Sequence, residues 1–363
     1  MATTIPHTTM KELTGYATTM QAITQDQYGS ADVLHLREVA KPEVGDDDVL
    51  IVVRAAGVHI GDWHMMTGQP YLMRIMGFGF RAPKARVRGM DVAGTVAAIG
   101  KNVTGFHAGD DVFGVCGGSF AEYACARSDK LAPKPPNLTF EQAAAVPTSA
   151  CTALQALRGP GEIQPGQKVL INGASGGVGL FAVPIARSFG AEVTGVCSTA
   201  KMDIVRSIGA DHVIDYTTQD FTRSGHQYDL ILDMVGNRSL SQFRRVLTPR
   251  GTLVLVGGER GDRLIGALSR SMQGLVVSPF VSQRLRPVLG AVNTQDLQFL
   301  TDLIEAGKVK PVIDRTYALS EVGDAMRHLT TGQARGKIVI SVRGAESVPE
   351  RMTVAGVAST NDH

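Results

Sequence analysis

The sequence predicts an α/β protein in which a β-rich domain is followed by a doubly wound parallel sheet. Residues 168–179 read KVLINGASGGVG, a short apolar strand that runs into a glycine-rich turn. From about residue 166 short strands and helices alternate, which is typical of a parallel sheet with crossover helices. Residues 20–145 instead contain apolar runs separated by Gly and Asp turns, as expected for antiparallel strands. We therefore expect two domains of different architecture.

The expected elements can be placed by their residue ranges. In the parallel-sheet domain we expect strands at 168–172, 192–196, 212–215, 229–233 and 252–256, and helices near 177–189, 201–208 and 238–247. Pro184 lies inside the first of these helices and predicts a bend there, because proline removes a backbone hydrogen bond.

The β-rich domain should contain strands at 49–55, 91–99, 111–115 and 120–123, and a helical bridge capped by Thr139 should cover 139–157. After residue 290 we expect a helix at 297–305, a strand at 314–318, a helix at 319–329 and a strand at 336–342, which return to the first domain. These expectations divide the chain into a flexible extension (1–19), a β-rich domain (20–145), a parallel-sheet domain (146–290), a returning segment (291–343) and a flexible tail (344–363).

Composition excludes several classes of protein. The formal net charge of the 363 residues is only +2, which gives no electrostatic case for nucleic acid or an anionic membrane. No apolar run approaches the roughly 20 residues of a membrane span, and the first 20 residues lack the apolar core of a secretory signal. The four cysteines are scattered, without a C-x-x-C pair, as in proteins of a reducing compartment. We therefore expect a cytoplasmic protein without a membrane span and without a nucleic-acid partner.

The glycine-rich turn carries the first chemical prediction. A strand, a glycine turn and a helix in this order hold a dinucleotide pyrophosphate, because the backbone approaches the phosphates closely and the helix N-terminus offers free N–H groups. Ala174 and Ser175 stand between the first two glycines, so the spacing differs from G-x-G-x-x-G. The candidate cofactor-binding residues of this turn are Gly173, Ser175, Gly176, Gly177, Val178 and Gly179.

The end of the next strand indicates which dinucleotide is bound. This strand runs into CSTAK (197–201), where an acidic residue would grip a ribose 2′-hydroxyl and repel a 2′-phosphate. Ser198, Thr199 and Lys201 offer hydroxyls and a positive charge instead, which favours NADPH over NADH. The alternative is an ordinary helix N-cap, with Ser198 or Thr199 capping and Lys201 in solvent.

Several motifs in order resemble the medium-chain dehydrogenase/reductase superfamily across about residues 20–343, and especially its zinc-independent, zeta-crystallin-like quinone oxidoreductases. These motifs are AAGVHIGDWHMMTG (55–68), GMDVAGTVAAIGKNVTGFHAGDDVFG (89–114), EQAAAVPTSACTALQAL (141–157), INGASGGVGLFAVPIARSFGAEVTGV (171–196), GADHVIDY (209–216), LDMVGN (232–237) and GKIVI (336–340). The resemblance implies a GroES-like catalytic domain, a Rossmann cofactor domain, a cleft between them and often a dimer or tetramer, of which we expect a homodimer.

The zinc-dependent branch of the superfamily needs three protein ligands around a catalytic zinc. The matching positions carry His59, Met90 and Thr148, which do not make such a site, and the cysteine-rich structural lobe is missing. We therefore expect no metal and predict hydride transfer from NADPH to a quinone or an α,β-unsaturated carbonyl, since these acceptors are already activated. The alternatives are a zinc-free alcohol dehydrogenase or carbonyl reductase, and a cofactor-binding protein with little turnover.

The resemblance also implies the candidate catalytic residues, each with an alternative. His59 would hydrogen-bond the nicotinamide ribose or relay a proton, or else be a loop histidine bonded to backbone. Asp62 matches an acidic position of the same loop, or is a turn or cap carboxylate that holds the loop. Tyr71 lies near the position of a proton-donating Tyr in related enoyl reductases, or it only lines the pocket.

Further cofactor contacts are implied by the same resemblance. Gly236, Gly257 and Gly258 match backbone contacts near the nicotinamide, and Tyr216 matches a residue that borders the adenosine phosphate, with strand-end packing as its alternative. Lys337 lies near the cleft in the family, or is a surface charge. Residues 71–89 would form either an apolar pocket with a basic rim for a bulky acceptor, or a packed loop with solvated charges.

Overall fold

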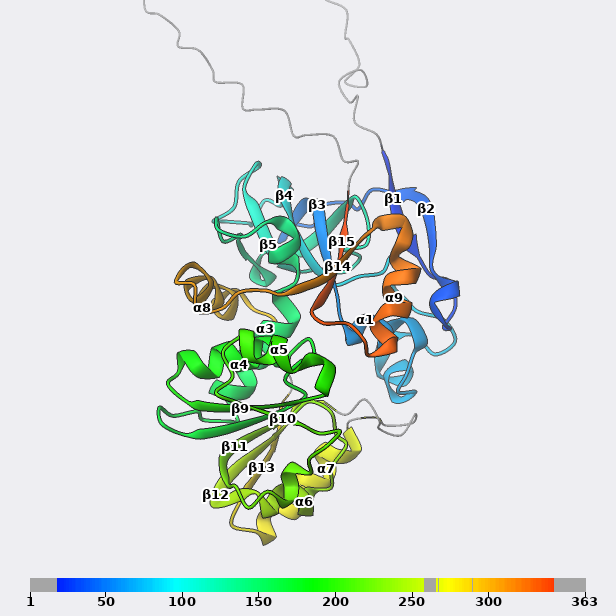
Figure 1. Cartoon of the computed structure of the whole chain (residues 1–363). Coiled ribbons are helices and arrows are strands. Elements are labelled where there is room, and N and C mark those ends of the chain that lie inside the picture. The colour runs from blue at the N-terminus through cyan, green and yellow to red at the C-terminus, as the bar shows by residue number, and fades with distance from the viewer. Residues whose placement is uncertain (1–17, 258–265, 267, 289, 343–363) are drawn as a thin grey trace, which may run out of the picture.

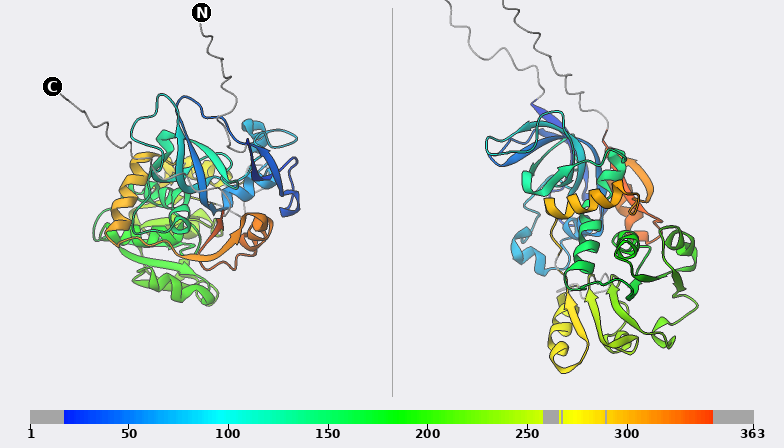
Figure 2. Two further views of the ribbon diagram at one scale, coloured as in Figure 1. Left: turned by 90° about the horizontal axis from the view of Figure 1, so that it is seen from above. Right: turned by 90° about the vertical axis from the view of Figure 1, so that its left-hand side faces the viewer.

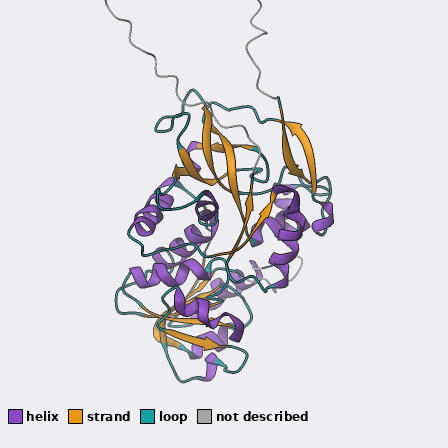
Figure 3. Cartoon of the chain, turned by 45° about the horizontal axis from the view of Figure 1, so that its top comes forward, coloured by secondary structure: helices purple, strands orange, loops and turns teal. Residues whose placement is uncertain are grey.

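The computed structural model describes residues 18–257, 266, 268–288 and 290–342. Two lobes are joined through helix α3 (Pro147–Arg158), with the β-rich lobe above the parallel sheet in Figure 1. The view from the side in Figure 2 and the colouring by secondary structure in Figure 3 show that each lobe is built around its own sheet. Of the expected extension only Thr18 and Thr19 are described, and Thr19 begins β1; the expected tail lies outside the described residues. No described helix is long and apolar enough to cross a membrane.

The β-rich lobe contains a seven-stranded sheet in the order β14-β15-β3-β4-β5-β7, with β6 paired to β3. All its pairs are antiparallel except β14 with β15, and β1 and β2 form a separate antiparallel pair. The strands are β1 (Thr19–Thr24), β2 (His35–Ala40), β3 (Asp48–Val58), β4 (Asp91–Ile99), β5 (Asp111–Val115), β6 (Tyr123–Arg127), β7 (Leu131–Pro133), β14 (Ile313–Ala318) and β15 (Lys337–Ser341). The C-terminal strands thus return to the first lobe.

The helices of this lobe connect or flank the sheet. They are α1 (Ile60–Thr67), the short π-helical segment η2 (Arg74–Phe78), α2 (Phe140–Ala144), α8 (Thr294–Glu305) and α9 (Val322–Thr331). The expected bridge at 139–157 is interrupted at Pro147, which starts α3 because it lacks an N–H and is accepted at the first helical position. Thr139 caps α2 as expected.

The second lobe is a six-stranded parallel sheet in the order β10-β9-β8-β11-β12-β13. Its strands and helices are β8 (Lys168–Asn172), α4 (Gly179–Ser188), β9 (Glu192–Cys197), α5 (Met202–Ser207), β10 (His212–Asp215), β11 (Tyr228–Asp233), α6 (Leu240–Arg245), β12 (Leu247–Leu255), α7 (Leu268–Val277) and β13 (Arg284–Pro287). The chain runs outward in both directions from β8, so the direction of winding reverses between β8 and β11. Ligands of such sheets bind at the carboxyl ends of the strands at this reversal.

One apolar core reaches across both lobes. It contains Ala55 and Phe113 from the upper sheet, Val169 and Phe181 from the lower lobe, and Leu154 from α3. The lobes are therefore held by shared packing around α3 as well as by the chain connections.

Some expectations about single elements were wrong. The strand expected at 120–123 lies at Tyr123–Arg127, and the segment 57–71, expected as a loop, contains α1. Strands β1, β2, β7 and β13 and helix α7 were not expected at all, since short or partly exposed elements leave little periodicity. Pro184 lies within α4 as expected and the helix continues to Ser188, while the bend there stays a prediction.

Candidate active site

The glycine turn between β8 and α4 is shaped for the close approach of a ligand. Gly173 has a φ of +92°, and a Cβ at Gly179 would lie 2.2 Å from the carbonyl oxygen of Gly173. Side chains are therefore excluded at both positions. Gly176 and Gly177 are exposed beside the first turn of α4, where the N–H groups of Leu180, Phe181 and Ala182 donate to the carbonyl oxygens of Gly176 and Val178. Among the described residues, the N–H groups of Gly177, Val178 and Gly179 have no backbone acceptor. The turn can hold a pyrophosphate against these groups.

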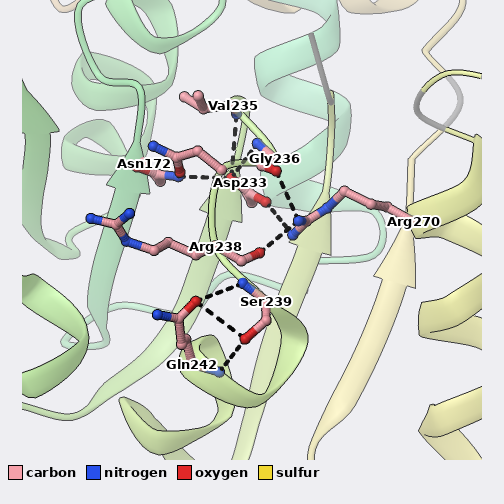
Figure 4. Close-up of polar contacts among 9 residues, drawn as sticks. Asn172, Asp233, Val235, Gly236, Arg238, Ser239, Gln242 and Arg270 are labelled. Atoms are coloured by element: carbon pink, nitrogen blue, oxygen red, sulfur yellow. Dashed lines mark hydrogen bonds and ion pairs between the residues drawn. The ribbon is translucent and has the colours of Figure 1, made fainter. Parts of the chain in front are cut away.

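The loop after β11 packs on the glycine turn and is fixed by a buried ion pair (Figure 4). A Cβ at Gly173 would lie 2.7 Å from the side chain of Val235. Asp233 is fully buried and accepts hydrogen bonds from Asn172 Nδ2 (2.8 Å) and the backbone N–H of Gly236 (3.1 Å). Arg270 of α7 donates to its other oxygen at 2.7 Å.

Arg270 fixes the backbone of this loop as well. Its Nη1 donates to the carbonyl oxygens of Gly236 (3.0 Å) and Arg238 (2.6 Å). A Cβ at Gly257 would lie 2.5 Å from the carbonyl oxygen of Met234. The structure thus brings Gly236 and Gly257 to the loop that packs on the glycine turn, whereas Gly258 lies outside the described residues.

The residues expected at the adenosine end lie together at the ends of β9 and β10. Tyr216 is half-exposed, and its N–H donates to the carbonyl oxygen of Cys197 at 3.1 Å. Lys201 donates to the carbonyl oxygen of Gly332 in the other lobe at 2.7 Å. Ser198 makes no side-chain capping bond, so its reading as an ordinary N-cap was wrong.

An acidic side chain that we did not expect lies beside Thr199. Asp215, at the end of β10, accepts from the Thr199 hydroxyl at 2.5 Å, and its other oxygen accepts from the Thr217 hydroxyl at 2.7 Å and the Thr217 N–H at 2.9 Å. The hydrogen bond from Thr199, followed by that from Thr217, lowers the pKa of Asp215. Both carboxylate oxygens are thus already bonded to protein groups.

Six side chains meet where the two lobes join, and we call them the interdomain polar cluster: His59, Asp62, Asp91, Thr148, Ser149 and Lys337. Lys337 is buried, and its Nζ donates to Ser149 Oγ (2.9 Å) and to the carbonyl oxygen of Val58 (3.2 Å). A Cβ at Gly177 would lie 3.9 Å from this Nζ. Lys337, on β15 of the β-rich lobe, therefore lies beside the glycine turn, and the alternative of a surface charge at this position is wrong.

His59 caps α1 and leaves one ring nitrogen without a hydrogen-bond partner. Its Nδ1 accepts from the Gly61 N–H at 3.0 Å, so the neutral ring carries its proton on Nε2. The buried Nε2 lies 3.6 Å from Asp62 Oδ2 and 3.9 Å from Asp91 Oδ1, and has no hydrogen-bond partner among the described residues. Asp62 accepts from the His59 N–H at 3.0 Å, which is the capping role considered as its alternative.

Asp91 is the central acceptor of the cluster, and we did not single it out from the sequence. Its Oδ1 accepts from the N–H (3.1 Å) and the hydroxyl (2.5 Å) of Thr148, while Oδ2 has no hydrogen-bond partner within the described structure. Burial raises the pKa of Asp62 and lowers that of Lys337. His59 Nε2 and Asp91 Oδ2 are thus two buried polar atoms of one cluster that lack a hydrogen-bond partner among the described residues.

The described residues do not include a set of metal ligands. No group of three or more His, Cys, Asp or Glu side chains in this part of the chain is arranged to hold a metal ion. Thr148, at one of the positions compared with zinc ligands, instead donates to Asp91. The cysteines at 116, 125, 151 and 197 are unpaired, and burial raises the pKa of Cys125 and Cys197 to about 11.

Tyr71 is not joined to the cluster by any hydrogen bond or ion pair of the described residues. Its ring is partly exposed and lies under the guanidinium of Arg74, 4.8 Å from ring centroid to Cζ. Trp63 and His64 contact one another edge to face on α1.

Two polar residues of the cluster, Asp91 and Ser149, were missed in the sequence. The signal that could have revealed them is a polar residue at the start of an otherwise apolar strand or helix.

Known proteins resemble the chain over most of its length. Residues 45–136 match the alcohol dehydrogenase GroES-like domain, and residues 208–340 match the zinc-binding dehydrogenase family. The 2-methylene-furan-3-one reductase of Solanum lycopersicum is 34% identical over 88% of this chain and 79% of its own length. A chloroplastic quinone oxidoreductase of Triphysaria versicolor is 32% identical over 88% of this chain and 98% of its own length.

A solved structure gives the same result for the fold. The quinone oxidoreductase from Coxiella burnetii superposes with a TM-score of 0.76 at 30% identity, covering 90% of this chain and all of that chain. The expected pair of a GroES-like and a Rossmann-type domain is confirmed. The chain therefore belongs to the medium-chain dehydrogenase/reductase superfamily, in its zinc-independent quinone oxidoreductase-like branch.

Proposed function

We propose that this protein is a zinc-independent, NADPH-dependent reductase that transfers hydride to a quinone or an α,β-unsaturated carbonyl. The observation that supports the proposal is the contact between the glycine turn and the interdomain polar cluster. The glycine turn meets, through Lys337, a buried cluster in which His59 Nε2 and Asp91 Oδ2 are unpartnered. The relatives named above as quinone oxidoreductase and 2-methylene-furan-3-one reductase support the same class of acceptor.

The residues present fit a nicotinamide dinucleotide. A Cβ would fill the cradle at Gly173 and Gly179, while Gly176 and Gly177 leave the α4 N-terminus open to a pyrophosphate. Gly236 and Gly257 would border its nicotinamide half, and Ser175 and Val178 lie within the same turn. The bound cofactor would supply the hydride.

The protein contributes orientation and hydrogen bonding to the reaction. His59 Nε2–H would donate to an oxygen of the acceptor or of the ribose, and such a preorganised donor stabilises charge that develops on oxygen. Asp62 holds a proton to higher pH than most carboxyls, because burial raises its pKa. Lys337 and Ser149 would fix the junction against which the nicotinamide lies. Tyr71 remains a second candidate proton donor.

The preference for NADPH is part of the proposal. Residues 198–201, directly after β9, include no acidic residue, and the two oxygens of Asp215 accept hydrogen bonds from Thr199 and Thr217. Ser198, Thr199, Lys201 and Tyr216 would surround the 2′-phosphate, with Lys201 as its positive charge.

The test is turnover. Purified protein with NADPH and an ortho-quinone or a 2-alkenal should oxidise NADPH well above the enzyme-free background, measured by the loss of nicotinamide absorbance. Tight NADPH binding without reduction of any quinone, alkenal or enone would contradict the proposal and favour a cofactor-binding protein.

We also propose a homodimer that forms along β13. This strand ends the parallel sheet, and an unpaired strand edge offers backbone groups to a second copy. Next to it, the apolar side chains Met272, Leu275, Val276 and Phe280 are exposed. Light scattering should give twice the mass of the chain, and Phe280→Asp should shift the protein toward monomer; a monomeric wild type would contradict the proposal.

We propose a reducing compartment, the cytoplasm, because the four cysteines are unpaired. The relative from Triphysaria versicolor is named chloroplastic, so fractionation of cells that express the protein is the deciding measurement.

A further inference from the structure

A pocket of about 210 Å³ lies in the β-rich lobe between α1 and residues 73–88. Its walls are mainly apolar and include Met65, Met73, Phe78 and Pro83, and Arg88 also lines it. An apolar cavity of ~150 Å³ is large enough to hold a benzene ring. This pocket therefore has room for a short apolar molecule.

The walls of the pocket are held by specific contacts. The Tyr28 hydroxyl donates to the carbonyl oxygen of Gly79 at 2.8 Å, which fixes the end of η2. Arg74 lies over the Tyr28 ring and donates to the carbonyl oxygens of Gly68 (2.9 Å) and Thr67 (3.0 Å). Arg74 thus joins η2 to the end of α1 through two of its guanidinium nitrogens.

Arg88 is the unusual member of the lining. Its side chain is buried, with 6% of the residue exposed, and its Nη1 donates to the carbonyl oxygen of Ala85 at 2.9 Å. It forms no ion pair with any carboxylate of the described residues. Residues 71–90 contain no Asp or Glu, and Lys84, which also lines the pocket, adds a second positive charge.

An unpaired buried guanidinium is costly, because little in an apolar surrounding replaces its hydration. Burial lowers the pKa of Arg88, and the charge of Asp62 opposes this effect without reaching ion-pair distance. Arginine nevertheless stays protonated in proteins, so the charge cannot be relieved by loss of the proton. A ligand that brings a carboxylate to Arg88 would remove this cost.

We propose that this pocket binds a small monocarboxylate with a short apolar body, and that Arg88 is the counter-ion of its carboxylate. The apolar walls select the body of the ligand, and the planar guanidinium can bind a carboxylate through two parallel hydrogen bonds. This inference concerns binding and does not rest on the proposed reductase activity.

The experiment measures binding of hexanoate, hexan-1-ol and hexylammonium to the full chain by calorimetry, without NADPH or an acceptor. Hexanoate should bind about 10- to 100-fold more tightly than hexan-1-ol, as a charged hydrogen bond allows, and hexylammonium should not bind. Arg88→Met should abolish this preference and Arg88→Lys should keep part of it. Arg86→Met is the matched control, since Arg86 is exposed and lies 3.9 Å from Asp26; it should bind hexanoate like the wild type.

Thermal unfolding separates a binding role from a purely structural one. If the role of Arg88 is to bind an anion, the ligand-free Arg88→Met variant should unfold at the same temperature as the wild type or at a higher one. Only the wild type should then be stabilised by hexanoate. Equal binding of hexanoate and hexan-1-ol, absence of hexanoate binding, or unchanged acid preference in Arg88→Met would overturn the proposal. None of these results depends on whether NADPH is oxidised.

Discussion

The glycine turn and the interdomain polar cluster lie next to one another but are built in opposite ways. The turn uses seven consecutive residues, 173–179, and its shape depends on the absence of side-chain atoms. The cluster uses side chains from positions between 59 and 337, and its properties depend on charge and burial. Adding a side-chain atom should therefore destabilise the turn and weaken cofactor binding there, whereas the cluster should be disturbed when one of its polar partners is removed.

The largest loss of stability should follow from breaking the Asp233–Arg270 ion pair. Such a loss would show that the glycine turn, although built without side chains, depends on a buried charge pair in the loop that packs on it. Arg270→Met leaves Asp233 buried without its counter-ion and should lower the free energy of unfolding by about 3–5 kcal/mol. Arg127→Met is the control, because Arg127 pairs with Asp129 at the surface and such pairs contribute ~0–1 kcal/mol. Urea unfolding measures both variants, and equal losses would contradict the assigned role of the buried pair.

Adding a single methyl group to the turn should have the next largest effect. Gly179→Ala places a Cβ 2.2 Å from a backbone oxygen and should cost about 1–3 kcal/mol of stability, with weaker NADPH binding. Gly117→Ala adds the same group where no atom lies within 4 Å, and should change stability by less than about 0.5 kcal/mol. If thermal unfolding does not separate these two variants, the turn does not depend on close packing.

A smaller effect, on the Kd for NADPH, is expected at the adenosine end of the site. There the side chain of Lys201, and not the backbone, would contact the 2′-phosphate. Lys201→Ala should raise the Kd for NADPH about 10-fold, the size of one charge-assisted hydrogen bond, and leave the Kd for NADH nearly unchanged. Lys168→Ala, at the opposite end of β8 from the glycine turn, should affect neither cofactor. Fluorescence titration with both cofactors decides, and equal losses for the two would refute a 2′-phosphate contact.

The smallest effect should appear as a pH dependence in the cluster. Burial raises the pKa of Asp62, so the folded state binds its proton more tightly than the unfolded state, whose carboxyl titrates near 3.8. The stability from this group is complete below that value and is lost as the pH rises through the raised pKa. Asp62→Asn should therefore flatten the decline of stability above pH 3.8.

Asp26 is the control, because its pKa is shifted in the direction opposite to that of Asp62. The hydrogen bond from Arg37 lowers its pKa, so its contribution is present above 3.8 and is lost as the pH falls. Asp26→Asn should flatten the acid side of the stability profile only. Urea unfolding between acid and neutral pH measures both profiles, and a wild-type profile in Asp62→Asn would show that burial does not perturb this carboxyl.

Much of the parallel-sheet lobe could be predicted because its determinants are local. The strands at 168–172 and 212–215 have the expected bounds, since buried parallel strands are short apolar runs that end in turns. Residues 60–67 form a helix that was not expected, because His59 and Asp62 define its start through a capping box rather than through apolar periodicity. The edge strand β13 could not be predicted, because its sequence, RLRP, contains two arginines and a proline and forms no apolar run.

The sequence by itself determined the superfamily, the order of the two sheets and the glycine turn, because spaced glycines and apolar runs act through neighbouring residues. Only the tertiary structure decided which distant polar groups share one buried environment. Asp91, Ser149 and Lys337 come together through the return of β15 to the first lobe, and Asp215 reaches Thr199 through the pairing of β9 with β10. The physical reason is that burial and charge pairing depend on distances in space, which strand order and lobe packing set and local patterns do not encode.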